Sequence, residues 1–407
     1  MRAVRSGKTV EPSEKNEKKE KEKMIDLSNM DKVIRSVYLD VVTTCLNEKT
    51  SPFYKKIDKS SVNIVGKEVV APVRFGINGG VACAAETAAV PPSGTPSLIN
   101  FRASLVNIYG NLEITDKLFR ASEVGAGGAV DVLNYEIDSL LDSAKFNLRR
   151  MLFQNGDGTL CKMSAAGDGK QLVSVDNTRN VVEGMIVDFV SSGSVVLTAK
   201  VTLVDKTNSQ IKVDKTVAST VAKDTIITLT GSYKCELNGI PYIFNGGGSN
   251  LYGNSRSIVG FALPSEYTES AVNASTLQSV IDHMEENGGE QPDMIVGSYA
   301  MRRKYLDAMN TARLNVETVV EDGFKAPAYN GIPIYAEPFI ADNEMFFLNT
   351  KDFMLAQLAD WSWVEGSTHE ILRPIYGKAA YAATLVKYCN LLCRRPKTQA
   401  KLTYSAE

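Results

Sequence analysis

The sequence predicts an α+β protein, and three patterns in it support that prediction. Residues Ala129–Gln154 place apolar side chains three and four positions apart along one stripe, which is typical of a long amphipathic helix. Before this helix, two runs of alternating apolar residues lie on either side of a small-residue segment and predict a long β-hairpin. After it, residues 172–240 contain short apolar runs separated by turn residues, as in a small β-sandwich or barrel.

Length and composition limit the classes of protein to consider. The 407 residues, 44% hydrophobic and 23% charged, are enough for two or three compact domains and match a soluble globular protein. The sequence has no apolar run of about 18 residues that would cross a membrane. The polar N-terminus carries no secretory pattern. The formal net charge of −2 does not indicate a nucleic-acid-binding protein.

The cysteines are spread along the chain without any CxxC pair. This spacing disfavours both a structural zinc site and a secreted disulfide framework, and it suits the reducing bacterial cytoplasm. Cys389 and Cys393 would share one face of a strand and are interpreted as small buried apolar residues. Trp361 and Trp363 also share a face, as core or contact residues. The six cysteines are Cys45, Cys83, Cys161, Cys235, Cys389 and Cys393.

The first 23 residues differ in composition from the rest of the chain. They combine basic residues with glutamates and contain almost nothing apolar, so we expect a flexible arm. Two interpretations stay open: a solubilising tail, or an arm that contacts DNA or scaffold. Residues Met24–Thr44 follow with the spacing of a short amphipathic helix. The basic residues of the arm are Arg2, Arg5, Lys8, Lys15, Lys18, Lys19, Lys21 and Lys23.

The hairpin predicted from the alternating runs has too few large side chains to form a core of its own. Its two runs are 69–75 and 101–109, and Pro91–Pro96 marks a turn between them. Such a hairpin needs a neighbour on which to pack, so we expect its outer part to contact a second subunit. The expected contact residues are Phe75, Ile77, Val81, Pro91, Pro92, Leu98 and Phe101.

Residues with recognisable catalytic spacing are missing from the sequence. The two histidines, His283 and His369, have no metal-ligand spacing, and neither a GxSxG elbow nor a phosphate-binding loop occurs. Gly125–Val130 departs from the dinucleotide fingerprint and is better explained as a hinge before the long helix. Asn155–Gly158 lacks the alternating oxygen ligands of a calcium loop. We therefore predict no enzyme, no cofactor and no metal site.

In the order of its elements the chain resembles the major capsid proteins of tailed bacteriophages, which have the Hong Kong 97-type fold. The resemblance covers about residues 60–395, and the order of short segments carries it. Val69–Ser122 resembles the E-loop, and Ala129–Gln154 with its following Asn155–Gly158 turn resembles the spine helix of the P-domain. Asn238–Ile240 is similar to the return into the P-domain. Pro292–Val296 and Asn330–Ile334 are similar to parts of the A-domain.

The resemblance implies a Hong Kong 97-like capsid fold with an inserted small β-domain, and a division of the chain into five parts. The N-terminal arm would be 1–66, with 1–23 flexible and charged, and the E-loop hairpin 67–122. The P-domain with the spine helix would combine 123–171, 241–265 and 350–387. The inserted β-sandwich or barrel would be 172–240, and the A-domain 266–349 with 388–407.

The sequence departs from the family in three places. The arm is too short for the fused scaffolding domain of some members, so either scaffolding is a separate protein or a longer precursor was cut. The insertion is absent from the simplest members; we expect it to serve as an external decoration or as a contact between neighbours. No lysine matches the position of the isopeptide cross-link that some relatives form.

The family implies a function as a structural subunit of the icosahedral phage head. Hexamers and pentamers of the chain would form a shell around double-stranded DNA, with scaffolding and portal proteins as further partners and no membrane involved. The protein would be assembled in the bacterial host cytoplasm and reside in the virion. The alternatives are an encapsulin-type shell around a cargo enzyme and, less favoured, an unrecognised hydrolase.

Overall fold

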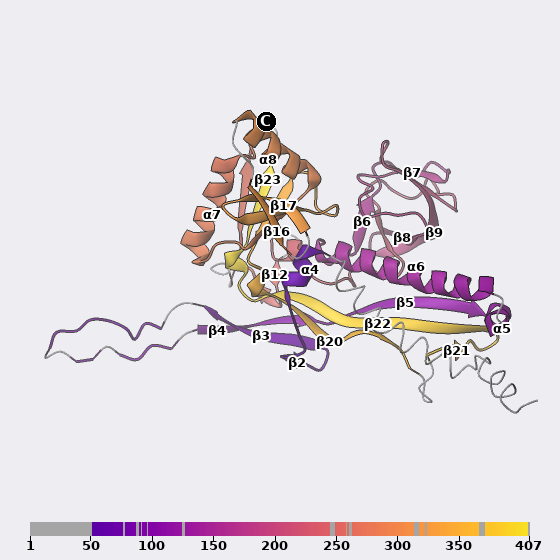
Figure 1. Cartoon of the computed structure of the whole chain (residues 1–407), viewed down its shortest axis with the longest axis horizontal. Helices are drawn as coiled ribbons and strands as arrows, with labels where there is room; N and C mark the ends of the chain where they lie inside the picture. Colours follow the sequence, from indigo (N-terminus) through magenta and orange to yellow (C-terminus); the bar gives the residue numbers. More distant parts are fainter. Residues whose placement is uncertain are drawn as a thin grey trace, which may run out of the picture. The chain divides into compact units, whose positions relative to one another are not determined.

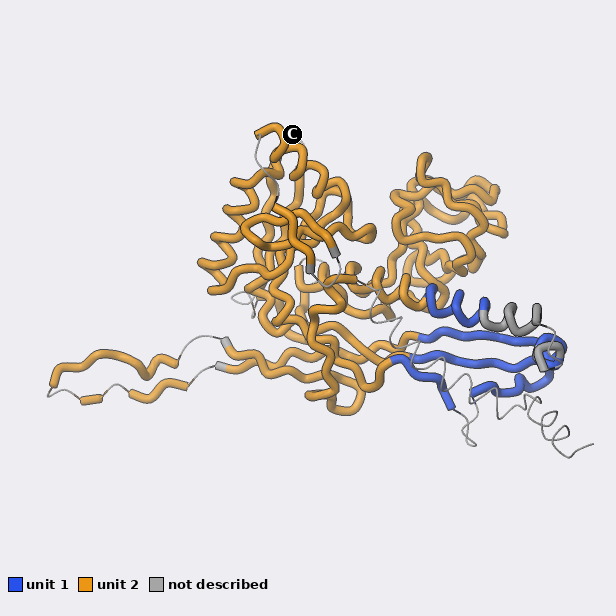
Figure 2. The backbone as a smooth tube through the Cα atoms, in the orientation of Figure 1, with its two compact units in different colours: residues 1–46, 109–143, 361–386 blue, residues 47–108, 144–360, 387–407 orange. Residues whose placement is uncertain are grey.

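The computed structural model describes residues 51–75, 78–86, 89–90, 92–95, 97–123, 127–244, 249–257, 259, 263–312, 317–321, 324–365 and 371–405. The helix expected at Met24–Thr44 lies outside them. Figure 2 shows two compact units, which are described separately below. The first contains 109–143 and 361–386 together with 1–46, and the second contains 47–108, 144–360 and 387–407.

The longest helix is α6, Gly127–Leu152, close to the span expected from the sequence (Figure 1). Five of its buried apolar side chains follow one another at alternating spacings of four and three residues, which is one face of an α-helix. They are Ile137, Leu141, Ala144, Leu148 and Met151; Arg150 and Leu152 are buried as well. The helix ends just before Asn155–Gly158, where Gly156 has a φ of +86°.

A sheet of long strands contains the second half of the hairpin region and the C-terminal part of the chain. Its order is β1-β20-β22-β21, with β5 also paired to β22. Strand β1 runs parallel to β20, so a segment near residue 58 pairs with one almost 300 residues further along the chain. The short helix α5, Asp116–Glu123, follows β5. The strands are β1 (Asp58–Ser60), β5 (Val106–Thr115), β20 (Phe353–Trp363), β21 (Arg373–Pro374) and β22 (Ala380–Cys393).

Helix α4, Pro52–Lys56, anchors the start of the described chain. Ser51 caps it by accepting a hydrogen bond from the Phe53 amide at 3.2 Å. The Phe53 ring is fully buried, with its centroid 5.2 Å from Phe353 and 6.1 Å from Phe153. This part of the chain is therefore packed into the second unit.

A seven-stranded mixed sheet with two helices forms the C-terminal α/β part (Figure 1). Helix α7, Ala274–Gly288, is capped by Asn273, and helix α8, Tyr299–Thr311, is capped by Ser298. Apolar residues from both helices and from the central strands make one core. In sheet order the strands are β14 (Ser265–Glu269), β23 (Ala400–Tyr404), β19 (Glu344–Leu348), β15 (Met294–Gly297), β18 (Ile332–Ala336), β17 (Phe324–Tyr329) and β16 (Glu317–Glu321).

Six antiparallel strands after α6 form a closed barrel. They follow the order β6-β11-β8-β9-β10-β7. The ring closes because Met163 bridges Val175 and the Asp176 amide donates to the Lys162 carbonyl at 2.9 Å. These hydrogen bonds join the first and the last strand of the sheet, so the six strands form a ring. The strands are β6 (Thr159–Lys162), β7 (Leu172–Ser174), β8 (Ile186–Ser191), β9 (Ser194–Asp205), β10 (Gln210–Val213) and β11 (Ile226–Leu229).

The barrel interior is filled with side chains. Val187, Phe189, Val201, Ile211 and Ile227 point into one apolar core and are fully buried. A six-stranded barrel packed in this way has no room for a ligand. Any role of the barrel therefore belongs to its outer surface.

The two ends of the barrel segment meet, which predicts that it can be removed. The Lys234 amide donates to the Asp157 carbonyl at 2.9 Å, and a Cβ atom on Gly158 would overlap the Ser232 carbonyl. Replacing residues 159–231 by a short Gly-Ser linker should therefore leave the rest of the chain folded. Circular dichroism and thermal unfolding should show a cooperative transition within a few degrees of wild type. An unfolded or aggregated chain would contradict the separate folding of the barrel.

Candidate assembly surface

The expected hairpin is present as two long strands in continuous register. Strand β3, Glu68–Phe75, pairs antiparallel with β4, Ser97–Ser104. The register runs from Glu68 opposite Ser104 to Phe75 opposite Ser97, and a short strand β2, Ile64–Val65, adds to the β3 edge. Because opposed residues share a face, Val69, Ala71 and Val73 lie on the same side as Phe101 and Ala103, and all five are buried.

The base of this hairpin is fixed to its own chain. The Phe101 ring lies 5.3 Å from that of Tyr252, and the Arg102 amide donates to the Tyr252 carbonyl at 2.9 Å. Asn254 donates through Nδ2 to the Asn100 carbonyl at 2.9 Å. Tyr252 lies in the turn between β12 (Asn250–Leu251) and β13 (Asn254–Ser255), and Asn254 begins β13. The 3-10 helix η2, Ile240–Tyr242, precedes this turn.

The tip of the hairpin lacks this support. Among its described residues, 78–86, 89–90 and 92–95, none is buried, and all except Gly80 and Gly94 are exposed. Val81 is 90% exposed and Val90 86%. A Cβ atom on Gly94 would lie 2.6 Å from the Gly79 amide nitrogen, so the two arms cross here at a distance only glycine permits. An apolar, almost uncharged tip held away from its own chain is typical of a docking element.

The predicted contact residues fall into three groups. Val81, Pro92 and Leu98 are exposed, as a contact residue must be. Phe75 ends β3, while Ile77 and Pro91 lie outside the described residues. Phe101 is a correction: it is fully buried against Tyr252 of the same chain and offers no surface to a second subunit. The basic arm residues Arg2 to Lys23 all lie outside the described part of the chain.

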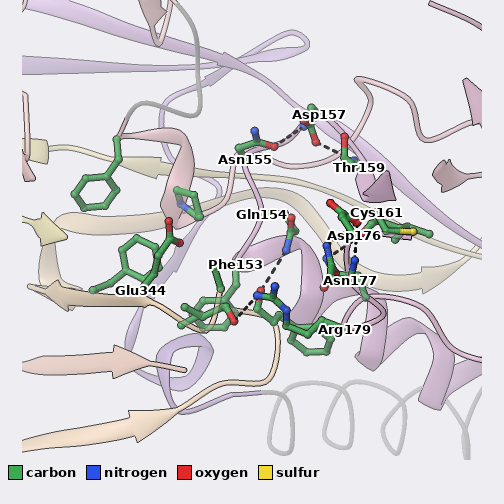
Figure 3. Close-up of a pocket in the computed structure, with 18 of the residues that line it drawn as sticks. Phe153, Gln154, Asn155, Asp157, Thr159, Cys161, Asp176, Asn177, Arg179 and Glu344 are labelled. Atoms are coloured by element: carbon green, nitrogen blue, oxygen red, sulfur yellow. Dashed lines mark hydrogen bonds between the residues drawn. The ribbon is translucent and has the colours of Figure 1, made fainter. Parts of the chain in front are cut away.

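A polar cleft of about 360 Å³ lies where α6 ends and the barrel begins (Figure 3). Several of its polar groups are engaged by the backbone. Asp157 accepts from the Thr159 amide at 2.8 Å (Figure 3). Asp176 accepts from the Lys162 amide at 2.9 Å. Arg179 donates to the Ile340 carbonyl at 2.8 Å. These side chains shape turns and hold the barrel, and they show no nucleophile–base pair.

A second polar group connects the start of the described chain to α6. Glu337 accepts from the Ser51 hydroxyl at 3.0 Å and forms a 2.8 Å ion pair with Arg149. Burial raises the pKa of Glu337, although Arg149 and Ser51 act against that rise. Sequence reasoning missed this anchor because a five-residue helix is too short to show periodicity. The Ser-Pro pair at its start, an N-cap followed by proline at N1, was the available signal.

The 3-10 helices η5, Thr350–Asp352, and η6, Pro396–Thr398, contribute to a third polar group. Arg395 pairs with Asp352 and with Glu290, each at 2.7 Å. Hydrogen bonding to the Arg395 guanidinium lowers the pKa of Glu290. The Glu290 carboxylate therefore binds a proton more weakly in the native state than in the unfolded chain.

The lowered pKa of Glu290 predicts that the folded chain loses stability in acid. A lowered carboxylate pKa contributes stability that is present above the ordinary value of 4.5 and is lost as the pH falls below it. Glu337, with its raised pKa, contributes with the opposite sign. Between pH 7 and pH 3 the Tm of wild type should fall further than that of Glu290→Gln, as calorimetry would show. Parallel pH profiles of the two proteins would contradict the assignment.

Neither a membrane-spanning helix nor a metal-binding cluster is present among the described residues. No helix among them is long and apolar enough to span a membrane. No group of three or more His, Cys, Asp or Glu side chains in these ranges is placed to hold a metal ion.

With this geometry, the fold is similar to that of a solved phage capsid, which agrees with the Hong Kong 97-type fold expected from the sequence. The capsid asymmetric unit of cyanophage A-1(L) matches with a TM-score of 0.54 at 9% identity, covering 90% of this chain and 93% of that one. At this identity the likeness establishes the fold alone.

Two other solved structures match more weakly, with TM-scores too low to support an argument. The holo-SrpI encapsulin from Synechococcus elongatus PCC 7942 matches at 0.46, with 8% identity over 87% of this chain and 88% of that one. The capsid of an empty GTA particle also matches at 0.46, with 12% identity over 86% and 89%. No family model matches the sequence, and no curated protein sequence matches it.

Proposed function

We propose that this chain is a structural subunit of a tailed-bacteriophage head, and not an enzyme. Copies would assemble as hexamers and pentamers into an icosahedral shell that encloses double-stranded DNA. The fold shared with the cyanophage capsid supports this proposal, and the hairpin β3–β4 is the observation that carries it. Its base is packed on Tyr252, while its apolar tip is exposed.

The hairpin explains why a single copy would be incomplete. Exposed valines such as Val81 and Val90 stabilise a structure only when another surface covers them, by about 25 cal/mol per Å² of apolar area removed from water. A neighbouring copy supplies that surface in every position of a closed shell. The contact would then be repeated around the particle, so a small gain per subunit would stabilise the whole assembly.

Several partners follow from the proposed role. Scaffolding and portal proteins would act during assembly in the bacterial cytoplasm, and the finished chain would reside in the virion. The basic arm, residues 1–23, would contact packaged DNA through phosphates and without sequence readout. The barrel would decorate the outside or contact a neighbour.

The contents of purified particles test the proposal against its main alternative. Particles made by the chain in a phage-producing host should be separated by gradient centrifugation, treated with nuclease and then opened. Nuclease-protected double-stranded DNA is the expected content. A single co-purifying enzyme without DNA would instead identify an encapsulin-type shell.

The arm has its own test. A peptide of residues 1–24 should bind double-stranded DNA with an affinity that falls as salt rises, because its lysines and arginines release counterions from phosphates. Fluorescence anisotropy at two salt concentrations about fourfold apart would measure this. The absence of salt-dependent binding would assign the arm to scaffold contact or to solubility.

A further inference from the structure

The turn between β21 and β22 is a rigid element that extends into solvent. The Lys378 amide donates to the Ile375 carbonyl at 3.1 Å, and the Ile375 amide donates to the Ala380 carbonyl at 2.9 Å. Gly377 has a φ of +79°, the value that the third position of a type II turn requires. This geometry fixes Tyr376 at the corner of the turn.

The Tyr376 side chain packs on none of the described residues of its own chain. It is 103% exposed, more than in an extended reference peptide. The three most exposed tyrosines of the described residues all lie in the first unit: Tyr376, Tyr135 at 72% and Tyr109 at 61%. Tyrosine is enriched where protein surfaces meet, and on a rigid turn it loses little conformational freedom when it docks.

The charges around these tyrosines are complementary. Strand β21 and the turn contribute one basic residue each, Arg373 and Lys378, and no acidic one. In contrast, the stretch of α6 from 127 to 144 contains four acidic residues and no basic one. Glu136 and Asp138 are exposed beside Tyr135. They lie more than two turns from the helix start, so the helix dipole does not account for them.

Arg373 and Lys378 have partners in their own chain, but these contacts leave both positive charges available to a second chain. Arg373 donates to the Val364 carbonyl at 2.8 Å, and Lys378 lies 3.6 Å from Glu113. Lys378 and Glu113 are both more than half exposed. Exposed pairs of this kind are weak, so a second chain can compete for the ammonium group.

We propose that this turn is the anchor of an interface between copies of the chain. Tyr376 of one copy docks on the exposed face of α6 around Tyr135 and Asp138 of a second copy, with Arg373 and Lys378 facing its carboxylates. The inference rests on the proposed shell function and names two surfaces that meet in it. Because the turn and the helix face are different surfaces, the contact is heterologous and can close a ring.

Replacing the tyrosine tests the anchor. Tyr376→Ser should fold with an unchanged Tm, because the side chain packs on none of the residues that the structure describes. The protein concentration needed for assembly, measured by light scattering, should rise by about tenfold or more, as for an interface hot spot. The matched variant Tyr376→Phe should assemble like wild type. Assembly of Tyr376→Ser at the wild-type concentration would overturn the proposal.

A cysteine pair tests the docking surface. One preparation carries Tyr376→Cys and another carries Asp138→Cys; the two are mixed, assembled, oxidised and run on a non-reducing gel. A covalent dimer should form in the mixture and not in either preparation alone, which controls for the exposed Cys83 and Cys235. No dimer in assembled particles would overturn the α6 contact. If wild type forms no particles at all, the proposed function itself fails.

Discussion

Replacing residues 76–96 by an Asn-Gly turn should abolish closed particles and leave a folded subunit. The deletion removes the exposed tip and keeps the paired strands β3 and β4, because Phe75 and Ser97 are opposed and a two-residue type I′ turn can join them. The buried base, with Phe101 on Tyr252, is untouched. The free energy of unfolding should therefore change by no more than about 1 kcal/mol.

Electron microscopy would show whether closed particles form, and urea unfolding would measure the free energy of unfolding. A matched control is Val81→Ser with Val90→Ser, which keeps the tip length and removes two exposed apolar side chains. It should weaken assembly without ending it, because the rest of the tip still reaches the neighbour. Normal particles from the shortened hairpin would show that its tip has no part in assembly.

Glu236→Gln should destabilise the subunit by about 3–5 kcal/mol, the usual cost of leaving one partner of a buried ion pair unpaired. Arg150, near the end of α6, is 0% exposed and donates both terminal nitrogens to Glu236 at 2.9 and 2.5 Å. Without the carboxylate, the guanidinium charge stays buried with a neutral amide as its partner.

The matched control for this pair removes both charges. Arg150→Met combined with Glu236→Leu should lie within about 2 kcal/mol of wild type, because an apolar pair needs no compensating charge. Urea unfolding with an unchanged m-value would compare the three proteins. A cost below about 1 kcal/mol for Glu236→Gln would mean that water reaches the pair.

Local patterns in the sequence predicted the elements that depend on near neighbours. The helix expected at Ala129–Gln154 is found at Gly127–Leu152, and the alternating residues of the hairpin are paired strands. Cys389 and Cys393 are buried, as expected, and Trp361 and Trp363, for which a core and a contact role were both open, are buried too. In these cases the spacing of apolar residues along one face of one element is enough to predict its secondary structure and its burial.

Contacts between distant segments were not predictable in the same way. The parallel pair β1–β20, and the Ser51–Glu337–Arg149 group, join segments whose proximity no local pattern encodes. Phe101 was assigned to an interface because the partner that buries it, Tyr252, lies 151 positions further along the chain. Tyr376 was not predicted as a contact residue, because a single tyrosine in a short turn is distinguished only by its exposure in the structure.

The most direct test of the shell proposal is an electron micrograph of the purified full-length protein after assembly. Closed particles of uniform size, with five- and six-fold clusters of subunits on their surface, are the predicted result. A preparation that stays monomeric under every assembly condition, with scaffold supplied, would contradict it.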